Sequence, residues 1–376
     1  MSVNRSLITP TSNPLLEQAL HDKLQRRGEA AGSLGELEPV AVRLGLMQNS
    51  LKPRFRDPQV VVFAADHGLV VDGISAPSRR QTHEQVQQLL TGQLPLSVFA
   101  RIQGMELSVV DCGVAKVLAP HEHLQQRKIA HGTRNARVGP AMSVEQAHAA
   151  IRAGMEIGDS LRGNLVACAG IGIGSHESAA LVLSRLTRTQ VRDLLISGPQ
   201  MSPDLLAHLM VIVQGAQGRH REAQDAVEVL AAFGGFEIGV MVGVMLVAAS
   251  KRHLIMVDGM AACAALMIAS QIATAVTDYC VFCRSHDHRG LDHALALFKA
   301  TALLELGMQS TDGTGATLAW PLLRSAAALL TDVAEGEDPG PSRPDGMFAP
   351  TGFASDGMDT PADGGRPAGA APVSGP

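Results

Sequence analysis

Five short apolar runs constrain the fold of this chain more than any other feature of its sequence. Each run lacks the alternation of apolar and polar residues that marks a half-solvated strand, and each ends in glycine or a polar loop. The runs are VVVFAAD (60–66), LSVVDCG (107–113), NLVACAG (164–170), LIMVDG (254–259) and DYCVFC (278–283). Helix-like stretches lie among them, at 83–103, 143–162, 177–195, 201–215, 237–251, 260–275 and 291–306. Buried strands alternating with helices predict an α/β fold, a doubly wound, Rossmann-like parallel sheet flanked by helices.

The C-terminal segment differs in composition from the rest of the chain. Residues 334–376 are about 40% Gly and Pro, which is typical of a segment that cannot bury enough surface to order itself. They also carry seven acidic and two basic residues, so the remaining body is formally neutral. We therefore expect a disordered, acidic tail over 334–376 and a folded body before it.

Composition also bears on the partners and the location of the protein. Aromatic residues make up only 3% of the chain and the formal net charge is −5, which argues against nucleic acid. The uncharged stretch 259–277 is long enough to span a bilayer, but its alanine-rich, Ser- and Gln-containing sequence predicts a buried helix instead. The polar start of the chain and its five scattered cysteines favour a reducing, cytoplasmic location. We expect small-molecule partners, with no nucleic acid and no membrane.

The carboxyl ends of parallel strands are where such sheets bind ligands. The first strand ends in Asp66 and His67, which we expect to contact a ligand. The alternative is that Asp66 caps the next segment and that His67 bonds to the loop backbone.

Two glycine-rich loops are candidates for holding a phosphate. Gly172, Gly174 and Ser175 precede a helix whose N-terminal N–H groups favour an anion, although Glu177 in the first turn would repel it. Asp312 precedes Gly313-Thr314-Gly315 and could present a carboxylate beside a nest of N–H groups. The alternatives are a tight turn into a packed helix at the first loop and a helix-capping aspartate at the second.

A group of cysteines and histidines raises the question of a zinc site. Cys280 and Cys283 lie near His286, His288 and His293, but their spacing matches no closed structural zinc site. We expect no metal.

An ordered set of motifs resembles one known family. The residues that carry the resemblance are Gly32-Ser33-Leu34-Gly35 with Leu37-Glu38, Phe63-Ala64-Ala65-Asp66-His67-Gly68, Asp72-Gly73-Ile74-Ser75-Ala76, Val109-Val110-Asp111 with Gly113-Val114, Gly132-Thr133, Pro140-Ala141-Met142-Ser143, Gly172-Ile173-Gly174, Glu228 to Ile238, Asp258-Gly259, His286, His293 and Gly313-Thr314-Gly315-Ala316. Together they resemble the nicotinate-nucleotide–dimethylbenzimidazole phosphoribosyltransferases of cobalamin assembly, the CobT family. The resemblance runs from about residue 15 to residue 333, in the same order along the chain.

The resemblance implies a fold and an activity. It implies a helical N-terminal segment over 1–58, joined by chain near the C-terminus, and an α/β phosphoribosyltransferase-like domain over 59–333. The family is usually homodimeric and uses no metal or cofactor. Its members move the ribose phosphate of nicotinate mononucleotide onto a nitrogen of dimethylbenzimidazole, and they release α-ribazole phosphate and nicotinate.

The resemblance also assigns roles to the candidate residues. Asp312 stands at the position of the catalytic base, and a carboxylate there can accept the ring proton of the incoming base. Gly172, Gly174, Ser175, Gly313, Thr314 and Gly315 would hold the phosphate and ribose. Asp66, His67 and Ser75 would contact the aromatic base.

Several departures from the family pattern fall on the expected site. Asp312 replaces a glutamate, which retracts the carboxylate by about 1.5 Å. The others are Ala169-Gly170-Ile171 for Gly-Glu-Met, Ser175-His176-Glu177 for Asn-Thr-Thr, Ser197-Gly198-Pro199-Gln200 for Arg-Gly-Thr-Gly and Gly290-Leu291-Asp292-His293 for Glu-Pro-Gly-His. The leading interpretation remains phosphoribosyl transfer, to dimethylbenzimidazole or a related base. One alternative is a weakened paralogue that binds ligand or joins a catalytic paralogue in a heteromer, and another is an unrelated dinucleotide-dependent oxidoreductase.

Overall fold

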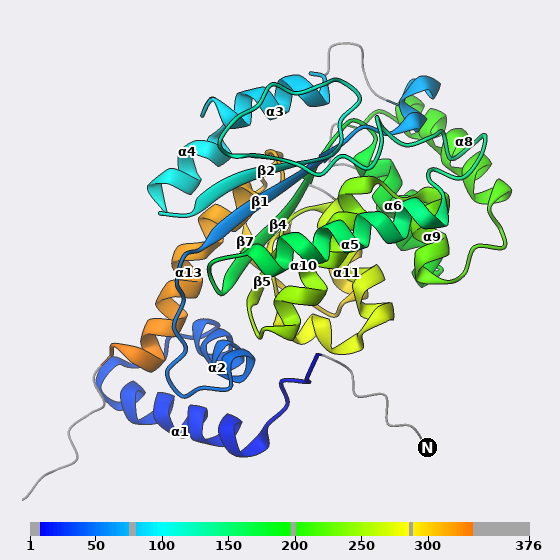
Figure 1. The fold of residues 1–376 in the computed structure, drawn as a ribbon. Coiled ribbons are helices and arrows are strands. Elements are labelled where there is room, and N and C mark those ends of the chain that lie inside the picture. The colour runs from blue at the N-terminus through cyan, green and yellow to red at the C-terminus, as the bar shows by residue number, and fades with distance from the viewer. Residues whose placement is uncertain (1–7, 75–79, 197–200, 286–288, 334–376) are drawn as a thin grey trace, which may run out of the picture. The chain divides into compact units, whose positions relative to one another are not determined.

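A parallel sheet forms the centre of the protein (Figure 1). The computed structural model describes residues 8–74, 80–196, 201–285 and 289–333, so the tail expected over 334–376 lies outside the described residues. Within these ranges the sheet has seven strands in the order β3-β2-β1-β4-β5-β6-β7. They are β1 (Gln59–Ala65), β2 (Glu106–Gly113), β3 (Leu124–Gln126), β4 (Leu165–Ile171), β5 (Leu254–Val257), β6 (Cys280–Ser285) and β7 (Ala302–Glu305). Every neighbouring pair is parallel, which confirms the predicted α/β class.

The strand order reverses between β1 and β4. Because β1 pairs with both β2 and β4, the chain winds outward in one direction from β1 to β3 and in the other from β4 to β7. This is the switch point of a doubly wound sheet, beside which ligands bind.

Helices cover both faces of the sheet (Figure 1). On one face α10 packs against β1, β2, β4 and β5, with α5 outside it and α11 beside it. On the other face α3 and α4 contact β2, and α13 contacts β6 and β7. The α-helices are α1 (Pro14–Ala31), α2 (Leu37–Gln48), α3 (Thr82–Leu90), α4 (Pro95–Ile102), α5 (Val144–Ser160), α6 (Ser175–Thr187), α7 (Val191–Leu195), α8 (Pro203–Arg219), α9 (Ala226–Phe233), α10 (Phe236–Ser250), α11 (Met260–Ile272), α12 (Arg289–Leu297) and α13 (Thr314–Thr331), and the short 3-10 helices are η1 (Gly68–Asp72) and η2 (Thr274–Tyr279).

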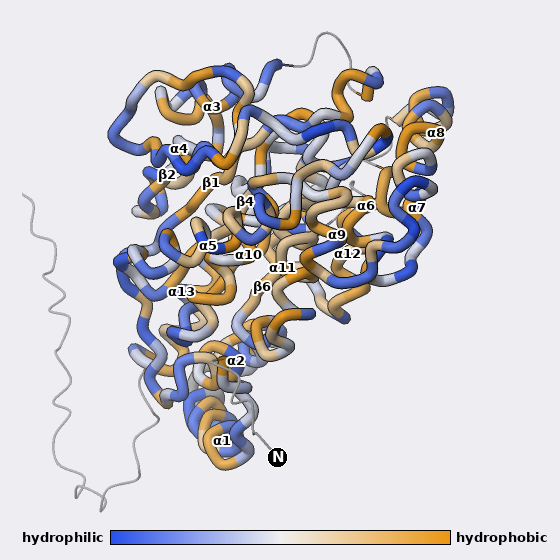
Figure 2. The backbone as a smooth tube through the Cα atoms, turned by 45° about the vertical axis from the view of Figure 1, so that its right-hand side comes forward, coloured by the Kyte–Doolittle hydropathy of each residue, from blue (hydrophilic) through white to orange (hydrophobic). Residues whose placement is uncertain are grey.

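The N-terminal helices pack against the last helix. Helix α2 contacts α13, and α1 contacts both of them, so segments far apart in the sequence form the smaller helical part (Figure 1). Figure 2 shows α1 alternating between hydrophobic and hydrophilic residues, as expected for a helix with one face on its neighbours. This arrangement confirms the expected joining of the N-terminal segment with chain near the C-terminus.

Several predicted element boundaries were wrong. The predicted helix 83–103 is two helices, α3 and α4, because Gly92 has a positive φ of 74° and Pro95 starts the second helix. The predicted helix 291–306 ends at Leu297, and residues Ala302–Glu305 form β7 instead. The predicted helix 177–195 is also split, into α6 and α7. The short edge strand β3 and the helix α9 were not predicted.

The buried helix predicted for the uncharged stretch 259–277 forms over the first half of that stretch, whereas Gln271, Ile272 and Thr274 are exposed. Its residues make up α11 and η2, and Met260 to Ala269 are buried in the core. Among the residues that the structure describes, no helix combines the length and the hydropathy that a membrane span needs.

Candidate active site

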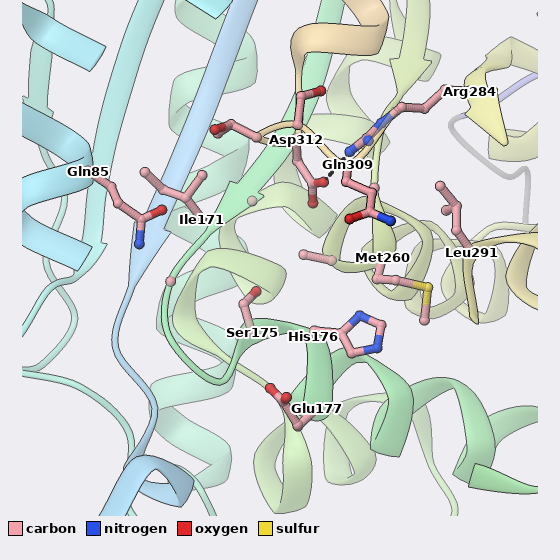
Figure 3. Close-up of a pocket in the computed structure, with 16 residues that line it drawn as sticks. Gln85, Ile171, Ser175, His176, Glu177, Met260, Arg284, Leu291, Gln309 and Asp312 are labelled. Atoms are coloured by element: carbon pink, nitrogen blue, oxygen red, sulfur yellow. Dashed lines mark hydrogen bonds and ion pairs between the residues drawn. The ribbon is translucent and has the colours of Figure 1, made fainter. Parts of the chain in front are cut away.

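A cavity of about 410 Å³ opens at the carboxyl ends of β4 to β7. Its size falls within the range of small-molecule sites, and its place is the one that the strand-end rule predicts. Figure 3 shows Asp312, Gln309 and Arg284 on one side of it and Ser175, His176 and Glu177 on the other. The lining residues are Gln85, Gly170, Ile171, Gly172, Ser175, His176, Glu177, Gly259, Met260, Ala261, Arg284, Leu291, Gln309, Ser310, Thr311 and Asp312.

An arginine joins two aspartates at one side of the cavity. Arg284 Nη2 donates to Asp312 Oδ1 at 2.6 Å, and Arg284 Nε donates to Asp258 Oδ1 at 2.6 Å. Its third nitrogen, Nη1, donates to the carbonyl of Met308 at 3.0 Å. Burial alone would lower the pKa of Arg284, but the Asp258 and Asp312 carboxylates raise it above its ordinary value. The guanidinium therefore stays charged and fixes the Asp312 carboxylate at the cavity wall (Figure 3).

Asp258 also caps the N-terminus of α13. Its Oδ2 accepts from the backbone N–H groups of Gly313 at 2.8 Å and Ala316 at 3.0 Å. Of the residues expected to form an anion nest, Gly313, Thr314 and Gly315, the first therefore has its N–H bonded to a buried carboxylate. None of these three residues lines the described cavity. Their part in phosphate binding stays a prediction.

The first glycine loop does line the cavity. A Cβ at Gly172 would lie 1.9 Å from the carbonyl oxygen of Ala65, so the strand ends approach too closely for any side chain there. Gly174 has a φ of +91° and packs against His67, outside the cavity lining. The structure thus brings Gly172 and Ser175 to the same cavity as Asp312, as the topology rule led us to expect.

Ser175 is connected to two buried charged residues. Its Oγ donates to Glu237 Oε1 at 2.8 Å, and the same oxygen lies 2.9 Å from His67 Nε2. Burial alone would lower the pKa of His67, but Glu237 raises it above its ordinary value through charge and hydrogen bonding. This cluster ties together the chain after β1 and the first turns of α6 and α10.

Two of the three residues expected to contact the aromatic base, Asp66 and His67, do not line the cavity. The Asp66 carboxylate accepts from Thr82 Oγ1 and, at 2.7 Å, from the backbone N–H of Ala115. His67 is bonded to Glu237, and neither side chain lines the cavity. Ser75 lies outside the described residues. These contacts differ from the alternative in which Asp66 caps the next segment and His67 bonds to the loop backbone, since η1 has no side-chain cap and His67 bonds to a carboxylate. Base binding by this set stays a prediction.

Several of the positions expected to depart from the family pattern line the cavity. Ile171, His176, Glu177, Leu291 and Asp312 all line it. The further departure over residues 197–200 lies outside the described residues. Four other positions of the same set, Ala169, Gly290, Asp292 and His293, do not line the cavity.

The cysteines of the candidate zinc group are buried free thiols. Burial raises the pKa of both Cys280 and Cys283, which disfavours the thiolate that binds zinc. In the described part of the chain no three His, Cys, Asp or Glu residues are grouped as metal ligands, and His286 and His288 fall outside it.

Sequence reasoning missed several residues that shape the site. Arg284 and Asp258 were not connected with Asp312, although each lies at or next to the carboxyl end of a strand, which is the signal that could have marked them. Gln85 reaches the cavity from α3 across the switch point (Figure 3). Glu237 could have been noted as an isolated acid in an otherwise apolar helix.

Comparison with known proteins identifies the family. Residues 9–340 match the model of a family described as phosphoribosyltransferase. This chain belongs to that phosphoribosyltransferase family. It is similar to the nicotinate-nucleotide–dimethylbenzimidazole phosphoribosyltransferase of Cupriavidus taiwanensis, with 41% identity over 85% of this chain and 92% of that protein. The corresponding protein of Shewanella oneidensis is 33% identical over 86% of this chain and 94% of its own length.

A solved structure of the same phosphoribosyltransferase family has the same fold. The crystal structure of the nicotinate-nucleotide–dimethylbenzimidazole phosphoribosyltransferase from Thermus thermophilus matches with a TM-score of 0.80 and 30% identity, and the match covers 88% of this chain and 100% of that one. Family membership makes this protein a glycosyltransferase by class, and it contradicts the dinucleotide-dependent oxidoreductase alternative.

Proposed function

We propose that this phosphoribosyltransferase moves the ribose phosphate of nicotinate mononucleotide to a ring nitrogen of dimethylbenzimidazole or a related aromatic base, in the assembly of the lower ligand of cobalamin. The observation that carries the proposal is one cavity lined by the Asp312 carboxylate and by the glycine loop at Gly172 and Ser175. The relatives that match over most of the chain are named for this reaction. The products are α-ribazole phosphate and nicotinate.

The reaction needs one proton acceptor, and it needs the anomeric carbon of the substrate to be held facing the incoming nitrogen. The nucleophilic nitrogen of the incoming base bonds to the anomeric carbon, and the bond from that carbon to the pyridinium nitrogen breaks. Its electron pair neutralises the pyridinium, so the nicotinate leaving group needs no acid. The proton on the other ring nitrogen passes to the Asp312 carboxylate, a type of assistance that contributes about a hundred- to ten-thousand-fold in rate. The reaction as written calls for no cofactor.

Arg284 determines how this base is presented. It donates to Asp312 Oδ1, which fixes one oxygen of the carboxylate at the wall. We assign phosphate and ribose binding to Gly172, Gly174 and Ser175, with Gly313, Thr314 and Gly315 behind Asp312. Contact of Asp66, His67 and Ser75 with the aromatic base remains part of the proposal, together with a homodimeric assembly. The five buried free thiols support a reducing, cytoplasmic location.

Release of nicotinate tests the proposal. Purified protein with nicotinate mononucleotide and dimethylbenzimidazole should release nicotinate, measured by chromatography. Asp312→Asn should abolish the release because an amide cannot accept the proton, and Asp312→Glu should keep or raise it. No release with any benzimidazole, purine or phenol acceptor would contradict the proposal.

The cavity wall also favours a second candidate function. Arg284 already engages the Asp312 carboxylate, and several of the departures from the family pattern line the same space. A catalytically weakened paralogue that binds the nucleotide, alone or in a heteromer with a catalytic paralogue, fits these features. Calorimetric binding of nicotinate mononucleotide without turnover would support this candidate over transfer.

A further inference from the structure

A buried cluster lies directly behind the cavity wall opposite Asp312. Glu237 is fully buried, with a 0% exposed side chain, and the His67 side chain is 2% exposed. Glu237 Oε1 accepts from Ser175 Oγ at 2.8 Å and lies 2.9 Å from His67 Nε2. Of the three residues, Ser175 is the one that lines the cavity (Figure 3).

The cluster fixes the direction of the Ser175 hydroxyl. A serine hydroxyl has one hydrogen, and a carboxylate can only accept, so the Ser175 hydrogen is committed to Glu237. The raised pKa of His67 favours an imidazolium that holds Glu237 in place. The Ser175 oxygen is thereby left to act toward the cavity as a hydrogen-bond acceptor.

Close contacts of the two glycines before Ser175 hold its backbone beside Glu237. Gly172 lies so close to Ala65 that a Cβ there would be 1.9 Å from its carbonyl oxygen. Gly174 packs on His67, where a Cβ would lie 2.8 Å from the His67 Cβ. Ser175 follows these two glycines at the start of α6, so its position depends on the same close contacts.

The Ser175 oxygen, as a hydrogen-bond acceptor, cannot bind a phosphate oxygen, which is an acceptor too. The Ser175 oxygen has no hydrogen to offer, and the Glu177 carboxylate at the same cavity adds negative charge. A partner must therefore be a donor. Nicotinate mononucleotide offers donors in its ribose hydroxyls, and the N–H of the incoming base is directed to Asp312 on the other side of the cavity (Figure 3).

We propose that Ser175, positioned by Glu237 and His67, accepts a hydrogen bond from a ribose hydroxyl of the substrate and selects ribosyl over deoxyribosyl nucleotides. The proposal rests on the proposed function, and it narrows the role of Ser175 from phosphate and ribose binding to the sugar alone. For this hydrogen bond Glu237 and His67 act as positioning residues, because they reach the ribose through Ser175.

The test compares nicotinate mononucleotide with its 2′-deoxy and 3′-deoxy analogues. The kcat/KM for nicotinate release and, independently of turnover, the Kd from calorimetry are measured for each. A hydroxyl that loses its buried partner forfeits about 1–3 kcal/mol, which corresponds to about 5- to 150-fold. We expect the wild type to prefer the ribonucleotide over one of the two analogues by a factor in this range.

Three variants test whether the preference for the ribonucleotide depends on Ser175. Ser175→Ala should raise the Kd of the ribonucleotide by about tenfold or more relative to the wild type. The Kd of the analogue that the wild type binds more weakly should change by no more than about threefold, so the variant should lose the preference for the ribonucleotide. Glu237→Gln should also reduce the preference, because an amide can donate to the serine and free its hydrogen. Ser184 is the control: it lies toward the far end of α6, and its hydroxyl donates to the carbonyl of Thr189. Ser184→Ala should keep the wild-type preference for the ribonucleotide.

The outcomes separate this proposal from the proposed function. If the wild type neither binds nicotinate mononucleotide nor releases nicotinate, the proposed function fails and this inference fails with it. If the wild type binds the ribonucleotide but shows no preference over either analogue, only the role of Ser175 is overturned. The same holds if the preference persists in Ser175→Ala.

Discussion

Arg284 satisfies three acceptors at once, and this makes it the residue on which the geometry of the site depends most. Its side chain is only 6% exposed and contacts Asp258, Asp312 and the carbonyl of Met308. Lysine keeps the charge but cannot direct three hydrogen bonds from one planar group. We therefore expect Arg284→Lys to lower kcat for nicotinate release by about a hundredfold, because a misplacement of about 1 Å in a catalytic group has that effect.

Removal of the charge at Arg284 should also lower the free energy of unfolding. In Arg284→Met the fully buried Asp258 would lose its cation, and breaking such a buried pair destabilises by about 3–5 kcal/mol. Urea unfolding followed by circular dichroism measures this loss. The control for the kcat of Arg284→Lys is Arg252→Lys, which should keep wild-type kcat, since Arg252 donates to the carbonyls of Leu46 and Met47 and lies over the ring of Tyr279, away from the cavity. Wild-type turnover in Arg284→Lys would show that Asp312 does not need this partner.

Helices α5 and α10 approach each other closely because both carry glycines four residues apart. A Cβ at Gly154 of α5 would lie 1.9 Å from the carbonyl oxygen of Val240, and one at Gly243 of α10 would lie 2.0 Å from that of Ile151. We expect Gly154→Ala to lower the free energy of unfolding by about 1–3 kcal/mol, since the two backbones must separate. Denaturant unfolding is the measurement.

The same substitution on an exposed helix gives the opposite expectation. A Cβ at Gly218 of α8 would meet no atom within 4 Å. Gly218→Ala should therefore leave stability unchanged or raise it by up to about 1 kcal/mol, through helix propensity and the unfolded chain. Equal effects of the two substitutions would contradict the close packing of α5 on α10.

At the scale of the whole molecule, the buried His67–Glu237 pair links stability to pH. Glu237 raises the pKa of His67 above its ordinary value of 6.5 despite burial, so the folded state binds that proton more tightly than the unfolded state does. The stabilisation by the His67–Glu237 pair is fully present below the ordinary pKa of histidine. It is lost as the pH rises through the pKa of His67 in the folded state. The advantage of the wild type over His67→Gln in unfolding free energy should therefore shrink as the pH rises above 6.5.

His253 provides a control of opposite sign. Burial, with Lys251 and Arg56 nearby, lowers the pKa of His253 to about 4. Between that value and 6.5 the unfolded state binds the proton more tightly, so the wild type should gain stability over His253→Gln as pH rises through this window. An advantage over His67→Gln that grows with pH would contradict the ion pair at His67.

The five inner strands of the sheet and the place of the site were predictable from the sequence, because both depend on local patterns, whereas the edge strands β3 and β7 were not. Residues 60–66 and 164–170 are apolar without alternation, and a strand buried on both faces requires that pattern. Parallel strands also bring their carboxyl ends to one edge, so Gly172 and Asp312 could be expected at one cavity although 140 residues separate them. The motifs added the family and the expected role of each position.

The partners of each site residue were decided only by the tertiary structure. Glu237 is 62 residues from Ser175 and 170 from His67, and no local pattern connects the three. In the same way, Arg284 joins two aspartates from different loops, and one of them accepts from the N–H of Gly313, a residue that was expected to hold a phosphate. Hydrogen bonds depend on atoms within about 3 Å. Such distances arise from how the strands and helices pack, so the sequence determined where the cavity lies, whereas the packed fold decided which atoms face it.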